Sequence, residues 1–155
     1  ELATGGKTSS LMFGIQWDLV LKHIENKQGK TQEELKNDST TWGNYYDATF
    51  EITKGKYSTD YGISFTEVNE TYPKPTNTQV LLTTGATERN SVLNIYDLAG
   101  NGWEWTLERS TSNRLPSVYR GGYYIHGGFD NPVASRDTYG TSNNSMSVSF
   151  RTALW

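Results

Sequence analysis

The chain has 155 residues and a net charge of −3, which leaves room for one domain with its own core and argues against two. Its basic residues form no cluster that would neutralise a phosphate backbone, which argues against a nucleic-acid partner. With no cysteine in the chain, disulfides, thiolate metal sites and thiol nucleophiles are excluded. No apolar run approaches the roughly 20 residues of a membrane-spanning helix, so membrane insertion is not expected.

The first predicted element is an amphipathic helix over Leu11–Ile24, in which Trp17 and other apolar residues recur at helical spacing. A break at Gly29 suits the C-cap of this helix. The segment Thr31–Glu34 has the form of a capping box, which predicts a second, short helix that runs from Thr31 towards Asn37.

From Trp42 onward, β-branched and aromatic residues are interrupted by Gly, Asn and Pro, a pattern typical of short strands in long loops. The predicted strands are Asp47–Ile52, Val80–Thr84, Gly102–Leu107, Val118–Tyr123 and Ser147–Leu154. Helices in the first part of the chain and irregular strands in the rest predict an α+β fold with two early helices. Long loops in a compact domain usually carry function.

The segment around the third predicted strand is the most informative part of the chain. Asp97 and Gly100–Gly102 favour a tight turn with positive φ angles. The alternation of the following strand places Trp103 and Trp105 on one face and Glu104 on the other. Taken alone, this pattern favours a structural turn before a core strand over a functional site.

The amino-acid sequence of the same segment resembles a known family signature. Residues Tyr96–Thr106 read Tyr-Asp-Leu-Ala-Gly-Asn-Gly-Trp-Glu-Trp-Thr and resemble the signature of the formylglycine-generating-enzyme (sulfatase-modifying factor) family. Tyr119–Tyr123 is similar to the Arg-Gly-Gly motif of the family, and Val148–Arg151 to its terminal Gly-Phe-Arg. Gly14–Asp18 lies where the family has its Trp-containing helix. The four landmarks occur in order and cover most of the chain.

This resemblance implies a C-type-lectin-like fold over residues 1–155 as a single domain. The strands that precede the Trp-containing helix in the family are expected to be missing, so the chain resembles the C-terminal part of a longer protein. The enzymes of the family oxidise a substrate cysteine with copper-binding cysteines of their own. Because this chain has no cysteine, the resemblance does not carry that activity over, and no enzymatic activity is predicted.

The resemblance also implies a possible structural calcium ion, since the turn before Trp-Glu-Trp can hold calcium in the family. Two carboxylates with backbone carbonyls suit such a hard cation. The alternative is that the aspartate caps the turn and the glutamate pairs with an arginine. The matching positions are Asp97, Gly100, Gly102 and Glu104.

Variable proteins of diversity-generating retroelements use the same branch of the fold and carry diversified positions between fixed landmarks. Similarity to them implies that residues 119–155 form a variable, ligand-contacting region. This region is rich in Tyr, Ser, Gly and Asn, a mixture that suits paratopes. The predicted contact residues are Tyr123, Tyr124, Ile125, His126, Gly127, Phe129, Asp130, Asn131, Asp137, Tyr139, Asn143 and Asn144.

Framework residues are predicted between and around these positions. The guanidinium groups of Arg120, Arg136 and Arg151 are expected to bind loop carbonyls or carboxylates such as that of Glu104. A rigid core is expected from side chains at the four landmarks. These are Trp17, Trp103, Trp105 and Phe150.

The predicted function is recognition of an unknown protein or surface glycan by a non-enzymatic scaffold. A bacterial cell surface, secretion or a phage particle is the expected location. One alternative is a metal-assisted oxidase or hydrolase that uses Asp97, Glu104 and His126 around an ion. Another is a structural domain of a phage or cell-surface assembly, with its tail buried against a neighbouring subunit.

Overall fold

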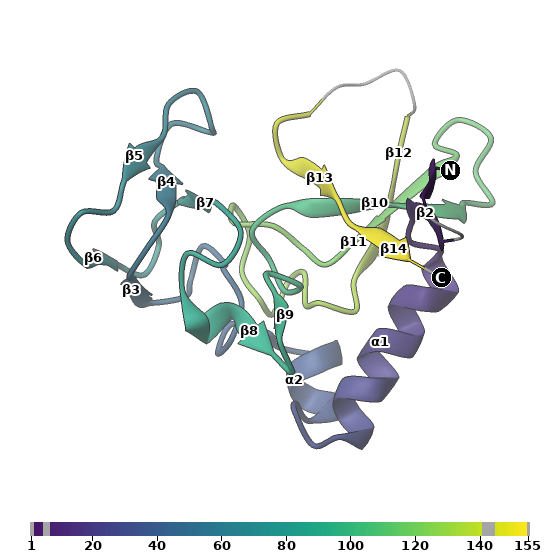
Figure 1. The fold of residues 1–155 in the computed structure, drawn as a ribbon, viewed down its shortest axis with the longest axis horizontal. Coiled ribbons are helices and arrows are strands. Elements are labelled where there is room, and N and C mark those ends of the chain that lie inside the picture. Colours follow the sequence, from purple (N-terminus) through teal and green to yellow (C-terminus); the bar gives the residue numbers. More distant parts are fainter. Residues whose placement is uncertain (1, 5–6, 141–144, 155) are drawn as a thin grey trace.

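The computed structural model describes residues 2–4, 7–140 and 145–154, and Figure 1 shows their arrangement. The two α-helices lie along the lower side of the view, and the strands β3 to β7 lie at its left end. This arrangement confirms the predicted α+β class. The elements are β1 Leu2–Thr4, β2 Lys7–Leu11, α1 Gly14–Asn26, α2 Gln32–Lys36, β3 Phe50–Ile52, β4 Lys56–Ser58, β5 Thr66–Glu67, β6 Tyr72–Lys74, β7 Leu81–Leu82, η1 Glu88–Asn90, β8 Ser91–Val92, β9 Ile95–Tyr96, β10 Trp103–Arg109, β11 Ser117–Arg120, β12 Arg136–Tyr139, β13 Val148–Phe150 and β14 Thr152–Leu154.

Helix α1 buries Trp17 and its apolar neighbours against the core, as its periodicity predicts. The helix begins at Gly14 and not at Leu11, because Leu11 pairs with Thr152 in a sheet. Gln28, with a φ of 55°, takes the left-handed position at the end of the helix that was predicted for Gly29.

Helix α2 is capped as predicted. Thr31 Oγ1 accepts a hydrogen bond from Glu34 N at 3.2 Å, and Glu34 Oε2 accepts one from Thr31 N at 2.9 Å. These reciprocal bonds satisfy two of the free N–H groups at the start of the helix. Leu35 is buried on its inner side, which ties the short helix to the core.

The central sheet has the strand order β12-β11-β10-β13, with β13 parallel to β10 and the other neighbours antiparallel. Its register places four side chains in one row across the sheet, namely Phe150, Trp105, Tyr119 and Asp137. Alternation puts Trp103 and Tyr139 on the same side, and these six residues are called the aromatic face below. The opposite side carries Glu104, Arg120 and Arg136, which are called the ionic face. The prediction that Trp103 and Trp105 share a face opposite Glu104 is confirmed.

A second sheet joins the two ends of the chain. Strand β2 pairs with β1 on one side and with β14 on the other, so β2 and β14 lie side by side in Figure 1. Two strands that the sequence did not predict, β1 and β2, thus precede the Trp-containing helix. The predicted strand Ser147–Leu154 is split at Arg151, because β13 pairs with β10 whereas β14 pairs with β2.

The remaining strands form the small sheets β3-β6, β5-β4-β7 and β8-β9. Several predicted strands are shorter than expected, since only part of each pairs with a neighbour. Strand β3 covers the end of Asp47–Ile52, and β7 the middle of Val80–Thr84. Within the described residues, no helix is long and apolar enough to cross a membrane.

Candidate ligand-binding site

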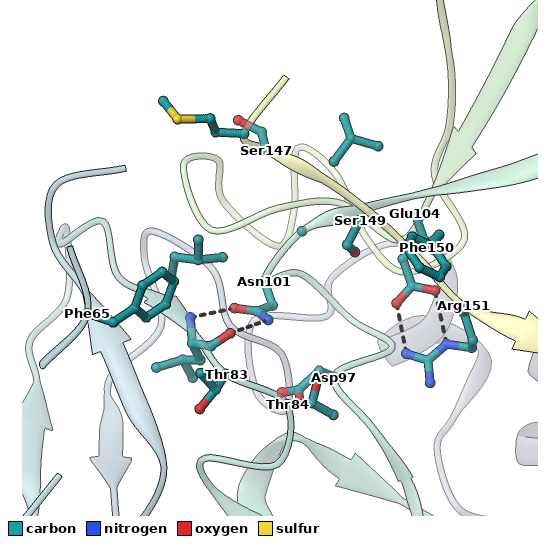
Figure 2. A pocket seen from close by; sticks show the side chains of 15 residues that line it. Phe65, Thr83, Thr84, Asp97, Asn101, Glu104, Ser147, Ser149, Phe150 and Arg151 are labelled. Atoms are coloured by element: carbon teal, nitrogen blue, oxygen red, sulfur yellow. Dashed lines mark hydrogen bonds and ion pairs between the residues drawn. The ribbon is translucent and has the colours of Figure 1, made fainter. Parts of the chain in front are cut away.

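The turn before β10 has the backbone that its sequence predicts. Asp97, Gly100 and Asn101 have φ angles of 53°, 70° and 63°. At Gly100 a Cβ atom would collide with the carbonyl oxygen of Asn44, so this position requires glycine. The Asn101 side chain connects the turn to β7, because its Oδ1 accepts from Leu82 N at 2.9 Å and its Nδ2 donates to Leu82 O at 3.1 Å (Figure 2).

A cavity of about 440 Å³ lies between this turn, β7 and β13 (Figure 2). Asp97, Gly102 and Glu104, three of the four predicted metal positions, line it together with side chains from both halves of the chain. The other lining residues are Phe65, Leu81, Leu82, Thr83, Thr84, Asn101, Met146, Ser147, Val148, Ser149, Phe150 and Arg151.

The buried carboxylate of Glu104 already has a cationic partner in this cavity. Arg151 Nε donates to Glu104 Oε2 at 2.9 Å, and Arg151 Nη2 donates to Glu104 Oε1 at 2.8 Å (Figure 2). Arg151 Nη2 also donates to the carbonyl of Tyr96 at 3.0 Å. Burial raises the pKa of Glu104, and the guanidinium opposes that rise. The predicted pairing of Arg151 with Glu104 is confirmed.

Asp97 is engaged as well. Its Oδ2 accepts a hydrogen bond from Gly85 N at 2.7 Å. Burial raises the pKa of Asp97, whereas the hydrogen bond from Gly85 N lowers it. Asp97 therefore holds the turn against the segment that follows β7.

Calcium takes six to eight oxygen ligands, whereas both Glu104 oxygens and Asp97 Oδ2 accept hydrogen bonds from the chain; Asp97 Oδ1 is buried and has no hydrogen-bond partner among the described residues. In the part of the chain that the structure describes, no three His, Asp or Glu side chains are grouped as metal ligands. His126 contacts Tyr123 and Asn131 and does not join Asp97 and Glu104. Calcium stays a prediction of the resemblance, and a melting-temperature titration with Ca²⁺ is its test.

The arginines of the ionic face are structural, as predicted. Arg120 is 2% exposed and donates from Nη2 to Asp18 Oδ1 at 2.7 Å and from Nε to Ser135 O at 3.1 Å. Arg136 forms ion pairs with Asp18 at 3.2 Å and with Glu108 at 2.7 Å. This network fixes the sheet to α1, and it satisfies loop carbonyls that have no strand partner.

The aromatic face consists of rings in mutual contact. Ring centroids lie 4.6 Å apart for Trp103 and Tyr119, 5.7 Å for Trp105 and Tyr119, and 5.7 Å for Tyr119 and Tyr139. Trp103 and Tyr119 are buried by their neighbours, whereas Trp105 and Tyr139 are half-buried. Phe150 is 66% exposed, so the prediction that it belongs to the core is wrong. The edge of this ring cluster is open to solvent.

Part of the predicted contact set lies at this face. Asp137 and Tyr139 belong to it, and Tyr123 extends it, with its ring centroid 5.8 Å from that of Trp103. His126 is exposed, and its Nε2 lies 3.1 Å from the Tyr123 hydroxyl. The Asn131 amide lies 2.7 Å from His126 Nδ1, which holds the imidazole beside the rings.

Other predicted contacts lie elsewhere. Phe129 is 73% exposed in the turn after β11, where Gly128 N donates to Asp47 Oδ1 at 3.2 Å. Gly127 and Asp130 flank that turn, and Ile125 is half-buried before it. Tyr124 is 1% exposed, so the prediction that its side chain contacts ligand at the surface is corrected. Its backbone N–H donates to the carbonyl of Asn101 at 3.2 Å, which holds the residue against the turn before β10. Asn143 and Asn144 lie outside the described residues.

Sequence reasoning missed Trp105 and Tyr119 as members of the site, since both were assigned to fixed landmarks. Each stands opposite the other in the register of β10 and β11, and Tyr119 stands opposite Asp137 in β12. The sequence predicts which side chains alternate along each strand, but it does not predict the register in which neighbouring strands pair. Only the register shows that these landmark rings and the predicted contacts form one surface.

The fold of this chain is similar to that of a protein of known structure, and its sequence matches a known family. It is similar to the structure of Treponema denticola variable protein 1, with a TM-score of 0.52 and 18% identity, over 99% of this chain and 50% of that one. The chain thus spans half the length of that protein and has a C-type-lectin-like fold. A search among curated proteins found no match. A family described as the sulfatase-modifying factor enzyme 1-like domain matches residues 17–154. The chain therefore belongs to the sulfatase-modifying factor enzyme 1-like domain family.

Proposed function

We propose that this chain is a non-enzymatic binding protein that presents a diversified surface on a C-type-lectin-like scaffold, in the manner of retroelement variable proteins. The name of the structural neighbour, a variable protein, is consistent with this role. A bacterial cell surface, a secreted state or a phage particle is the proposed location. A macromolecule is the proposed ligand.

The observation that carries the proposal is the division of one sheet into two faces. The ionic face holds the buried Arg120 in ion pairs with the partly exposed Asp18 and Glu108, and removal of either carboxylate takes a partner from the buried guanidinium. The aromatic face carries Asp137 and Tyr139 at positions open to water, next to Tyr123 and His126. Substitutions on that side can change recognition while the opposite side maintains the fold.

The contacts of the titratable groups support binding over catalysis. Asp97 and Glu104 are buried and occupied by partners, and His126 lies against other residues. The chain also has no thiol to act as a nucleophile or copper ligand. The alternative function is that of a structural domain in a larger assembly. Size-exclusion chromatography distinguishes it from a binding protein, because an assembly subunit on its own should self-associate.

The genomic test concerns the DNA beside the coding sequence. We expect a near-identical template repeat of the region that encodes residues 119–155, next to a reverse transcriptase gene. Differences between the two copies should fall at adenines of the template. A neighbourhood without such a repeat would contradict diversification.

The biochemical test uses two matched display libraries. Randomisation at Tyr123, His126, Asp137 and Tyr139 should leave most variants folded and yield binders to an unrelated test protein. The control library randomises four framework positions, Glu104, Arg120, Gly122 and Arg151, and most of its variants should fail to fold. Equal loss of folding in both libraries would count against the proposal.

The interior position of Tyr124 sharpens this test. Phe129→Ala should change the free energy of unfolding by less than about 1 kcal/mol, because its ring is largely in water. Tyr124→Ala should cost about 3 to 5 kcal/mol, as for other buried aromatic rings. Urea denaturation of the two variants distinguishes a contact residue from a core residue.

A further inference from the structure

Asp137 differs from the other carboxylates of the central sheet in having no cationic partner. Glu104 pairs with Arg151, and Glu108 pairs with Arg120 and Arg136. The two oxygens of Asp137 accept only neutral hydrogen bonds, from Thr138 N at 2.7 Å and from the Tyr119 hydroxyl at 3.4 Å. Among the described residues, no lysine or arginine forms an ion pair with it.

Aromatic rings extend from one side of this exposed carboxylate across the sheet. Tyr119 stands opposite it in the sheet, and Tyr139 follows it on the same side of β12. The half-buried Trp105 completes the row, 6.1 Å from Tyr139 between ring centroids. Burial raises the pKa of Tyr119 to about 12, and the charge of Asp137 contributes to that rise. Burial raises the pKa of Tyr123, and the charge of Asp137 adds to that rise.

We propose that the aromatic face binds a cationic side chain, lysine or arginine, of a protein partner, with Asp137 as counter-ion and Tyr139 and Trp105 as ring contacts. The inference rests on the proposed function and names the chemistry of its ligand. A cation gains both the carboxylate and the negative faces of the rings, which attract ammonium and guanidinium groups.

The Asp137 carboxylate, which has no cationic partner, favours a basic protein segment over a neutral glycan as the ligand of the aromatic face. A sugar that covers the aromatic face replaces the water at Asp137 with hydroxyl donors but supplies no opposite charge, so the carboxylate is hydrogen-bonded without being neutralised. A lysine or arginine side chain covers the same rings with its methylene stem and compensates the charge with its head group. Charge complementarity therefore favours the protein partner.

The experiment is a two-dimensional NMR titration of the isotope-labelled chain with three capped pentapeptides. The central residue is Arg, Lys or Gln, and the flanking residues are Gly. The Arg and Lys peptides should shift the Trp105 indole signal and the amide signals of Asp137 and Tyr139, with Kd in the millimolar range. The Gln peptide should not. Raising the salt from about 0.02 M to about 0.5 M should weaken the binding, because screening reduces ion pairing at an exposed site.

Variants locate the interaction. Asp137→Asn should weaken Arg-peptide binding about fivefold with an unchanged melting temperature, and Tyr139→Ala should weaken it about threefold in a chain that still unfolds cooperatively but melts somewhat lower, since Tyr139 packs on Tyr119 and Trp105. The matched control is Glu51→Gln, which removes an exposed carboxylate of β3 and should leave binding unchanged. Equal binding of the Gln peptide, no binding of any peptide, or full binding by Asp137→Asn would overturn the inference.

A sugar control separates the two kinds of ligand. If N-acetylglucosamine shifts the Trp105 signal and the Arg peptide does not, the ligand of the aromatic face is a glycan and the cationic ligand is refuted. The two proposals also fail separately. Folded binders from the Tyr123, His126, Asp137 and Tyr139 library, together with failed peptide titrations, would refute only the cationic ligand.

Discussion

At the scale of single residues, the pair of Glu104 and Arg151 shows how a landmark residue acts on stability. The carboxylate is buried and receives two hydrogen bonds from one guanidinium. Such a planar, two-bond pair compensates the loss of water around both charges. Removal of one partner leaves the other charge buried without compensation.

Arg151→Ala is expected to lower the free energy of unfolding by about 3 to 5 kcal/mol at neutral pH. Because the folded pKa of Glu104 is raised above 4.5, its protonated form is favoured in the folded state at low pH. The stability that protonated Glu104 contributes is fully present below pH 4.5, and it is lost as the pH rises through the folded pKa of Glu104. Urea denaturation should therefore show the cost of Arg151→Ala shrinking in acid.

The control is the double variant Arg151→Ala with Glu104→Gln. A neutral amide is cheaper to bury than an unpaired carboxylate, so this variant should recover part of the loss at neutral pH. A single variant Arg151→Ala as stable as the parent chain would show that the pair contributes nothing.

At the scale of elements, the segment after β11 depends on Gly122. Its φ is 77°, and a Cβ atom at this position would collide with the carbonyl oxygen of Asn131. Gly122→Ala should therefore cost more than about 3 kcal/mol, because backbone atoms would have to move. Thermal unfolding measures the loss.

Gly85 is the matched control for this substitution. It has a similar φ of 74°, but its Cβ atom would lie 3.6 Å from Tyr96 Cδ1, an ordinary contact. Gly85→Ala should cost only about 1 kcal/mol, the strain of the left-handed conformation. Equal losses for the two variants would contradict the clash at Gly122.

The elements also show which parts of the fold were predictable. Helix α1 and the capping box of α2 are encoded within a few neighbouring residues, so their patterns identified them. The division of Ser147–Leu154 into β13 and β14 depends on two partner strands, β10 and β2. No local pattern carries that information, since either half reads as an ordinary strand.

At the scale of the whole molecule, Lys74 connects β6 to the loop before β3. Its side chain has no exposed surface, and Nζ donates to the carbonyls of Tyr45 at 2.8 Å and Ala48 at 2.7 Å. Burial lowers the pKa of this amine to about 8 from 10.5. The stability of the molecule should therefore depend on pH in alkaline solution.

Between the folded pKa of about 8 and the ordinary lysine value of 10.5, the unfolded chain holds the Lys74 proton more tightly than the folded chain. The measurement ends at about pH 10, because tyrosines, with an ordinary pKa of 10.0, begin to lose protons there. Stability from this group should rise with pH across that window and stay constant below it. Lys74→Met should remove the rise and cost about 1 to 3 kcal/mol at neutral pH, because two buried carbonyls lose their donor. A parent chain with flat stability across the window would contradict this assignment.

The sequence by itself determined the α+β class, the family resemblance, both helices and the structural role of the three arginines. It could do so because these features depend on nearby residues or on landmark motifs. Only the tertiary structure decided that Trp105, Tyr119 and Asp137 form one row, that Tyr124 lies inside, and that the chain ends pair. The physical reason is register, since pairing between segments far apart in the chain sets which side chains meet and which face water.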